Sequence, residues 1–187
     1  MFKYSKSIPN VLTFLRVLAA PSLLLTYLLS GNNFLIAVIF ALACLTDWLD
    51  GYIARKQKSF SPLGAFLDPV ADKLLVTVAL MVIVHSHKSV FLLVFSVIIV
   101  SREIAVSALR EWMATIGKIK LMRVLQVAKI KTLVQMLGVG LLLLNLNNAF
   151  NSLGFVLLMI ATFLTLYSMV QYLKIASQDL TFFSEST

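Results

Sequence analysis

The sequence predicts an all-α integral membrane protein with six transmembrane helices, and its composition and apolar runs support this fold class. Of the 187 residues, 60% are hydrophobic and 13% are charged, and the mean hydropathy is +0.95. Soluble domains carry about 45–50% apolar and about 25% charged residues. The apolar runs approach the roughly 20 residues that a helix needs to cross a bilayer, and they adjoin each other. These features disfavour a soluble helical protein.

The predicted spans cover residues 11–29, 33–54, 69–86, 89–112, 124–146 and 152–173. The first span is preceded by two lysines and ends near the sequence LAAPS, which resembles the end of a secretory signal peptide. Its apolar run is long, however, and Pro21 would directly follow an Ala-x-Ala-like cleavage site. We therefore expect this segment to be retained as a membrane span.

Polar turns separate the other spans. SGNN (30–33) ends the first span, HSHK (85–88) ends the third, and NLNNAFNS (145–152) ends the fifth. Between the second and third spans, residues 55–64 combine charged residues with Ser, Pro and Gly, which predicts a turn that makes these two spans antiparallel neighbours. No repeat or flexible linker is visible. We expect a single domain over residues 1–187, with a loosely ordered tail at about 176–187.

The basic residues predict the orientation of the chain. All 16 Lys and Arg residues except Lys88 lie on the side of the spans that carries both termini. The positive-inside rule then places both termini, and the segment between the second and third spans, in the cytoplasm at the cell membrane. The net charge of +8 flanks apolar helices, where anionic headgroups are natural neighbours, so we expect contact with membrane lipids and not with nucleic acid.

Half of the eight acidic residues fall at one place, in the sequence from Asp47 to Asp72. An Asp near the centre of a bilayer costs about 2.5–3.5 kcal/mol on insertion scales. Asp47 and Asp50 are spaced i, i+3, and Asp68 and Asp72 are spaced i, i+4, so each pair projects from one helix face. Because the two helices are antiparallel neighbours, the pairs are expected to face each other near the cytoplasmic surface.

Four carboxylates this close cannot all ionise without compensating charge. Two divalent cations would supply that charge, and a set of oxygen ligands without His or Cys suits Mg²⁺ or Mn²⁺. A two-metal centre is in turn suited to phosphoryl transfer. The alternative is a structural one, in which the aspartates form ion pairs with the neighbouring Arg55, Lys56, Lys58 and Lys73. The small residues Gly51 and Gly64 are consistent with close approach of a ligand or with tight helix packing.

The aspartate segment also carries a resemblance. Residues 47–72 read D-x2-D-G-x2-A-R-x8-G-x3-D-x3-D, which resembles the full signature of the CDP-alcohol phosphotransferases. The fixed positions are Asp47, Asp50, Gly51, Ala54, Arg55, Gly64, Asp68 and Asp72. The segment PNVLTFLR (9–16) is similar to the N-terminal element of this family through Asn10, Thr13 and Arg16.

This resemblance implies six transmembrane helices, a homodimer and a site that faces the cytoplasm. It implies that Asp47, Asp50, Asp68 and Asp72 bind two divalent cations and that Asp72 acts as general base. The CDP donor would bind at Asn10, Thr13, Arg16, Asp47, Asp50, Gly51, Ala54, Arg55, Gly64 and Asp68.

The acceptor is expected to bind in the second half of the chain. Arg102 and Arg110 fall at the end of the fourth span, and Lys129 and Lys131 at the start of the fifth, on the same side as the aspartates. A doubly charged phosphomonoester needs such donors. Basic residues at cytoplasmic helix ends also snorkel to headgroups, so both interpretations stay open. Glu103 is expected to have a structural role, paired with Arg110 or with a base on another helix.

Three further segments extend the resemblance over nearly the whole chain: DPVADK (68–73), SREIAVSALR (101–110) and KIKTLVQM (129–136). They are similar to the branch of the family that condenses CDP-diacylglycerol with sn-glycerol 3-phosphate and releases CMP. Three alternatives remain at this stage. They are a cardiolipin synthase of the same family, which takes phosphatidylglycerol as acceptor, an ion-coupled transporter, and a scaffolding membrane protein.

Overall fold

The computed structural model describes the main chain of residues 8–57, 62–116 and 126–184, and the side chains of 14–47, 67, 69–116 and 130–174. Every regular element in this described part is an α-helix, as the sequence predicts. The six helices are α1 (Ile8–Ser30), α2 (Asn33–Gln57), α3 (Pro62–His87), α4 (Val90–Thr115), α5 (Gln126–Leu144) and α6 (Asn148–Ser184).

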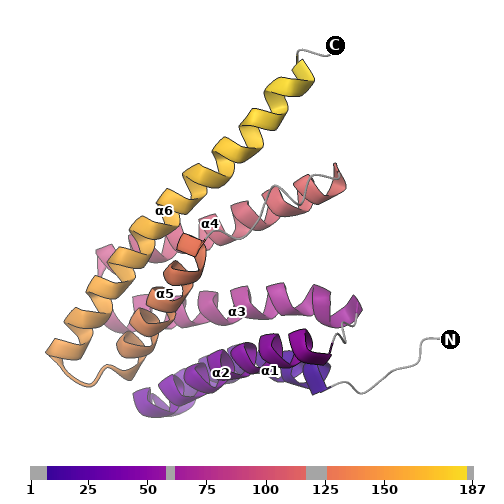
Figure 1. Ribbon diagram of the computed structural model, residues 1–187. Coiled ribbons are helices and arrows are strands. Elements are labelled where there is room, and N and C mark those ends of the chain that lie inside the picture. Colours follow the sequence, from indigo (N-terminus) through magenta and orange to yellow (C-terminus); the bar gives the residue numbers. More distant parts are fainter. Residues whose placement is uncertain (1–7, 58–61, 117–125, 185–187) are drawn as a thin grey trace.

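The helices pack as two groups of three (Figure 1). Helix α1 packs against both α2 and α3, and α6 packs against both α4 and α5. The groups are joined because α5 contacts α2 and α3, and α4 contacts α3. A shared apolar core forms where the groups meet, with Leu23, Ile36, Leu80, Ile99 and Leu158 each at most 2% exposed.

The outer surface is apolar, as a membrane environment requires. Leu28, Leu29, Phe91 and Val90 are each at least 67% exposed, which would be unfavourable for a chain surrounded by water. In the described residues, three segments are long and apolar enough to cross a bilayer: Pro69–His87, Val90–Thr115 and Asn148–Lys174. Shorter apolar helical segments cover Phe14–Ser30, Asn33–Asp47 and Ile130–Leu144. A membrane protein is therefore supported, and six spans stay a prediction.

Helices α5 and α6 approach each other closely at two glycines. A Cβ atom added at Gly154 would lie 2.9 Å from Leu142 Cγ and 3.1 Å from the Gly138 carbonyl oxygen. A Cβ added at Gly138 would lie 3.0 Å from the Leu158 nitrogen. Small residues at such crossings let helix backbones pack directly against each other in membranes. The two helices are thereby held in a fixed register.

Three short connections occur where the sequence predicts turns, at residues 31–32, 88–89 and 145–147. Gly31 takes a left-handed conformation with φ of 58°, which Gly adopts without steric cost. Figure 1 shows that the start of α1, the end of α2, the start of α3, and the ends of α4 and α6 lie toward one end of the molecule.

Two predicted boundaries differ from the structure. Residues 55–57 and 62–64, expected as parts of a turn, are helical, because α2 continues to Gln57 and α3 begins at Pro62. The centre of the expected turn, residues 58–61, lies outside the described residues. Arg, Lys and Gln are good helix formers, and Pro is well tolerated at the first position of a helix. At the other end of the chain, α6 continues to Ser184 into the expected loose tail, because no Gly or Pro follows Gly154 to interrupt it.

Candidate active site

One buried arginine joins the two aspartates whose side chains are described. Arg16 Nη1 on α1 lies 3.1 Å from Asp47 Oδ1 on α2 and 3.0 Å from Asp72 Oδ1 on α3. The Arg16 side chain is 1% exposed, whereas Asp47 and Asp72 are 49% and 41% exposed. The three residues, here called the carboxylate cluster, come from three different helices. The structure thus brings Asp47 and Asp72 together through Arg16 of α1, which packs between α2 and α3, whereas α2 and α3 make little direct contact with each other.

The carboxylate cluster fits the binding of a hard divalent cation. Among its three members two carboxylates face one guanidinium, Lys73 adds a cation to the lining of the adjacent cavity, and both carboxylates are partly exposed. The main chain stays helical through Asp50 and Asp68, which preserves their i, i+3 and i, i+4 spacing from Asp47 and Asp72. The side chains of Asp50 and Asp68 lie outside the described residues, and among the described ones no group of three metal-ligating side chains occurs.

A cavity of about 190 Å³ opens beside the carboxylate cluster. Asp47 and Asp72 line it from α2 and α3, and Glu103 lines it from α4. The α5 side of the cavity is formed by Thr132, Gln135 and Met136. The cavity therefore connects the first group of helices to the second at the level of the aspartates.

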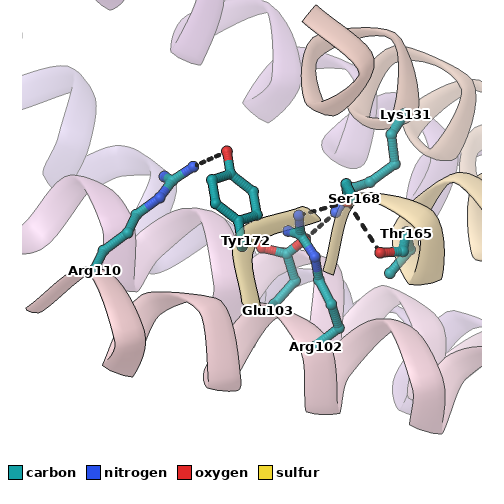
Figure 2. A network of polar contacts seen from close by, with 7 residues as sticks. All are labelled: Arg102, Glu103, Arg110, Lys131, Thr165, Ser168 and Tyr172. Atoms are coloured by element: carbon teal, nitrogen blue, oxygen red, sulfur yellow. Dashed lines mark hydrogen bonds and ion pairs between the residues drawn. The ribbon is translucent and has the colours of Figure 1, made fainter. Parts of the chain in front are cut away.

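Glu103 belongs to a set of buried and half-buried polar side chains on α4, α5 and α6, here called the cationic network (Figure 2). Its members are Arg102, Glu103, Arg110, Lys131, Thr165, Ser168 and Tyr172. Lys131 Nζ donates a hydrogen bond to Glu103 Oε1, and Arg102 Nη1 donates to the same oxygen at 3.3 Å. Arg102 and Lys131 are 5% and 2% exposed. The expected structural pairing of Glu103 is thus with a base on another helix, Lys131 of α5.

Helix α6 supplies the remaining partners of the cationic network (Figure 2). Arg102 Nη2 donates to Ser168 Oγ at 2.8 Å, and Ser168 Oγ donates to the Thr165 carbonyl oxygen at 3.0 Å. Arg110 Nη2 donates to Tyr172 Oη at 2.8 Å. The guanidinium carbons of Arg110 and Arg102 lie 5.2 and 5.7 Å from the centre of the Tyr172 ring, within the range of cation–π attraction.

The cationic network carries more positive than negative charge. Arg102, Arg110 and Lys131 contribute three cations, and Glu103 is the one carboxylate among its members. The buried Nε atoms of Arg102 and Arg110 make no hydrogen bond within the described residues. Burying uncompensated charge is unfavourable, so this arrangement is suited to an anion that carries more than one negative charge.

Several predicted site residues lie where their side chains are not described. Their main chain is helical throughout. These residues are Asn10, Thr13, Asp50, Gly51, Ala54, Arg55, Gly64, Asp68 and Lys129. Their assigned roles therefore stay predictions.

Sequence reasoning missed the contribution of α6. Ser168 and Tyr172 are both fully buried and both bind a predicted acceptor-site arginine. The available signal was the run of hydroxyl-bearing residues Thr162, Thr165, Ser168 and Tyr172 along an otherwise apolar span. Their spacing of three or four residues places them along one side of the helix.

The amino-acid sequence is matched by the model of a known protein family over most of its length. The family model for CDP-alcohol phosphatidyltransferase matches residues 6–167. The chain therefore belongs to this family. Membership supports the enzyme interpretation over the ion-coupled transporter and the scaffolding protein.

Individual relatives match over nearly the whole chain and share one name, CDP-diacylglycerol–glycerol-3-phosphate 3-phosphatidyltransferase. The protein of that name from Pseudomonas fluorescens is 48% identical over 91% of this chain and 90% of its own length. The protein of that name from Haemophilus influenzae is 44% identical over 93% of this chain and 95% of its own length. The one in Escherichia coli K12 is 40% identical over 93% and 97%.

Proposed function

We propose that this protein transfers the phosphatidyl group of CDP-diacylglycerol to the 1-hydroxyl of sn-glycerol 3-phosphate, giving phosphatidylglycerophosphate and CMP. The observation that carries the proposal is the pairing of Asp47 and Asp72 on Arg16, beside a cavity that Glu103 of the cationic network also lines. The shared name of relatives that are 40–48% identical supports this choice of donor and acceptor.

On the donor side, Asp47, Asp50, Asp68 and Asp72 would hold two divalent cations, Mg²⁺ or Mn²⁺. When bound, these ions supply positive charge to the phosphoryl oxygens and the leaving group. The carboxylate cluster supports this assignment through its excess negative charge and its partial exposure. The other donor-binding residues are those of the signature and of the N-terminal element, including Arg16.

Asp72 is the general base of the proposed reaction. Its carboxylate takes the proton of the acceptor 1-hydroxyl as that oxygen forms a bond to the β-phosphorus of the donor. The bond from this phosphorus to the oxygen bridging it to the α-phosphorus breaks, and CMP leaves. The ion pair with Arg16 fixes the carboxylate orientation at the cavity. Positioning a base in this way is a large part of its catalytic effect.

On the acceptor side, Arg102, Arg110, Lys129 and Lys131 bind the phosphate of sn-glycerol 3-phosphate. Arg102 and Lys131 are held in the interior by Ser168 and Glu103, respectively, and so are positioned before the acceptor arrives. Charged donors at fixed positions favour a phosphomonoester over a neutral alcohol.

The proposal also covers the membrane topology and the oligomeric state of the enzyme. The chain crosses the cell membrane six times, with both termini and the site facing the cytoplasm, and it forms a homodimer. The distribution of basic residues supports the orientation, and the family resemblance is the reason for proposing a dimer. Mass measurement of the detergent-solubilised protein by light scattering tests the dimer.

The central experiment compares acceptors. Purified protein in mixed micelles with CDP-diacylglycerol and Mg²⁺ is given sn-glycerol 3-phosphate or phosphatidylglycerol, and CMP release is measured. We expect CMP with sn-glycerol 3-phosphate and only background release with phosphatidylglycerol. The reverse result would identify a cardiolipin synthase of the same family. No release with either acceptor would contradict the proposed function.

A further inference from the structure

A buried glutamine lines the cavity beside the carboxylate cluster. Gln135 of α5 is 3% exposed, and its Oε1 atom makes no hydrogen bond within the described residues. Six other residues in the described part have buried side-chain atoms without a partner, but none of those residues lines this cavity. Gln135 is thus distinguished by combining an unsatisfied buried amide with a position at the site.

A polar group at this position is unexpected on structural grounds. Gln135 lies in the middle of an apolar helix, and neighbouring core positions such as Val139 and Leu142 are hydrophobic. A Met or Leu would fill a similar volume without leaving a polar atom unsatisfied. The amide is therefore more readily explained by something that it binds than by the packing of α5.

The surroundings of Gln135 define what it would bind. The same cavity is lined by Asp72, the proposed base, and by Glu103, which accepts hydrogen bonds from Lys131 and Arg102. Lys131 precedes Gln135 by one helical turn. A small acceptor with its reacting hydroxyl at Asp72 and its phosphate toward the cationic network would pass along the α5 side of this cavity.

We propose that the Gln135 side-chain amide hydrogen-bonds the non-reacting C2 hydroxyl of sn-glycerol 3-phosphate and is thereby a specificity-determining residue. This inference rests on the proposed function. A hydroxyl both donates and accepts, and so does an amide, whose oxygen and nitrogen exchange places by a half-turn of the side chain. Unlike a carboxylate, the amide achieves this without adding negative charge that would repel the acceptor phosphate.

The experiment is a thermodynamic cycle in which two proteins are each compared with two acceptors. Wild type and Gln135→Met are each assayed for CMP release with sn-glycerol 3-phosphate and with 3-hydroxypropyl phosphate, the same acceptor without its C2 hydroxyl. We expect wild type to lose about tenfold in kcat/KM on the analogue, and Gln135→Met to lose about tenfold on sn-glycerol 3-phosphate, as for one uncharged hydrogen bond. Gln135→Met should then show no further loss on the analogue.

Two outcomes would overturn the inference. Equal use of both acceptors by wild type would do so without any variant, so the test does not depend on Gln135→Met folding. Losses that multiply to about a hundredfold in the combined case would show that the side chain and the hydroxyl act independently. Thr77→Val serves as the matched control, since Thr77 lines the same cavity from α3. It should keep the wild-type preference between the acceptors.

Failure of this inference is distinguishable from failure of the proposed function. Wild-type CMP release with sn-glycerol 3-phosphate tests the function. A protein that passes this test but shows no preference for the C2 hydroxyl keeps the function and loses the role assigned to Gln135.

Discussion

The carboxylate cluster and the cationic network differ in charge, burial and origin. The carboxylate cluster is built by α1, α2 and α3, carries an excess of negative charge, and exposes 49% and 41% of its two aspartates. The cationic network is built by α4, α5 and α6, carries an excess of positive charge, and buries Arg102 and Lys131 almost fully. Under the proposed function, the first group of helices would bind cations and the second group would bind an anion.

This difference separates the roles of the two halves. A partly exposed set of carboxylates can exchange ligands with the surrounding solvent, as the proposed metal-dependent donor site requires. Buried cations that are already hydrogen-bonded keep a fixed geometry, which favours recognition of one small anionic acceptor. Changes to the carboxylate cluster should therefore affect turnover with every acceptor, whereas changes to the cationic network should act on acceptor binding.

Removal of divalent metal should have the largest effect. Treatment with a chelator is expected to abolish CMP release, because the aspartates would then lack the positive charge that stabilises the transferred phosphoryl group. Adding back Mg²⁺ or Mn²⁺ should restore it. Helical content measured by circular dichroism should stay unchanged and serves as the control. Undiminished turnover in protein shown to be metal-free by elemental analysis would contradict the assigned role of the carboxylate cluster.

Asp72→Asn should lower kcat by about 10²–10⁴-fold, the usual contribution of a positioned general base. Asn keeps the size of the side chain and an oxygen that can accept from Arg16, so the melting temperature should change little. Glu111→Gln is a suitable control because Glu111 is exposed on α4. The kcat of Glu111→Gln should equal that of wild type. Near-normal turnover of Asp72→Asn would show that the Asp72 carboxylate is not the general base and serves only in a structural ion pair.

Arg102→Gln should raise the KM for sn-glycerol 3-phosphate by about 10–100-fold, as expected for a lost charge-assisted hydrogen bond. The KM for CDP-diacylglycerol should stay near the wild-type value. The KM of Arg102→Lys for sn-glycerol 3-phosphate should lie between those of wild type and Arg102→Gln. Lys keeps the positive charge but lacks the planar guanidinium group that reaches Ser168. If neither KM changed, Arg102 would have only a structural role, and the proposal that the cationic network binds the acceptor would be contradicted.

Tyr172→Phe should have the smallest effect, a rise of about two- to tenfold in the KM for sn-glycerol 3-phosphate. The substitution removes the hydroxyl that accepts from Arg110 but keeps the ring beside both guanidinium groups. Tyr167→Phe on the same helix is the matched control, since Tyr167 is 56% exposed. An equal rise in both variants would mean that the Arg110–Tyr172 hydrogen bond does not contribute to acceptor binding.

The sequence predicted the carboxylate cluster well because helix periodicity fixes relative positions within a helix. The i, i+3 and i, i+4 spacings predicted which aspartates share a helix face, and the short connection predicted that Asp47 and Asp72 lie near each other. In the structure these two residues meet through Arg16 of α1, which packs against both helices. The contacts of Arg16 could not be predicted from the sequence, because the rotation of α1 about its axis is set by packing against α2 and α3. The family resemblance named Arg16 without indicating that it would join two aspartates.

Only the charged members of the cationic network were predicted from the sequence. Arg102, Arg110 and Lys131 stand out in an apolar sequence, but Ser168 and Tyr172 do not, because uncharged polar residues occur in many membrane helices. The end of α2 and the start of α3 were predicted several residues too far from the connection between them. Charged residues from Arg55 onward suggested a turn, but α2 continues to Gln57 because Arg, Lys and Gln are good helix formers.

The ion pairs of Arg16 have a consequence for biosynthesis. A ribosome completes the first helix before it reaches Asp47, and it must add a further 25 residues before Asp72 emerges. Until then the nascent chain carries a guanidinium in an apolar segment without the two counter-ions that surround it in the finished protein. The first helix therefore needs a hydrated neighbourhood, such as the membrane surface or the insertion machinery, until the third helix arrives to complete its enclosure.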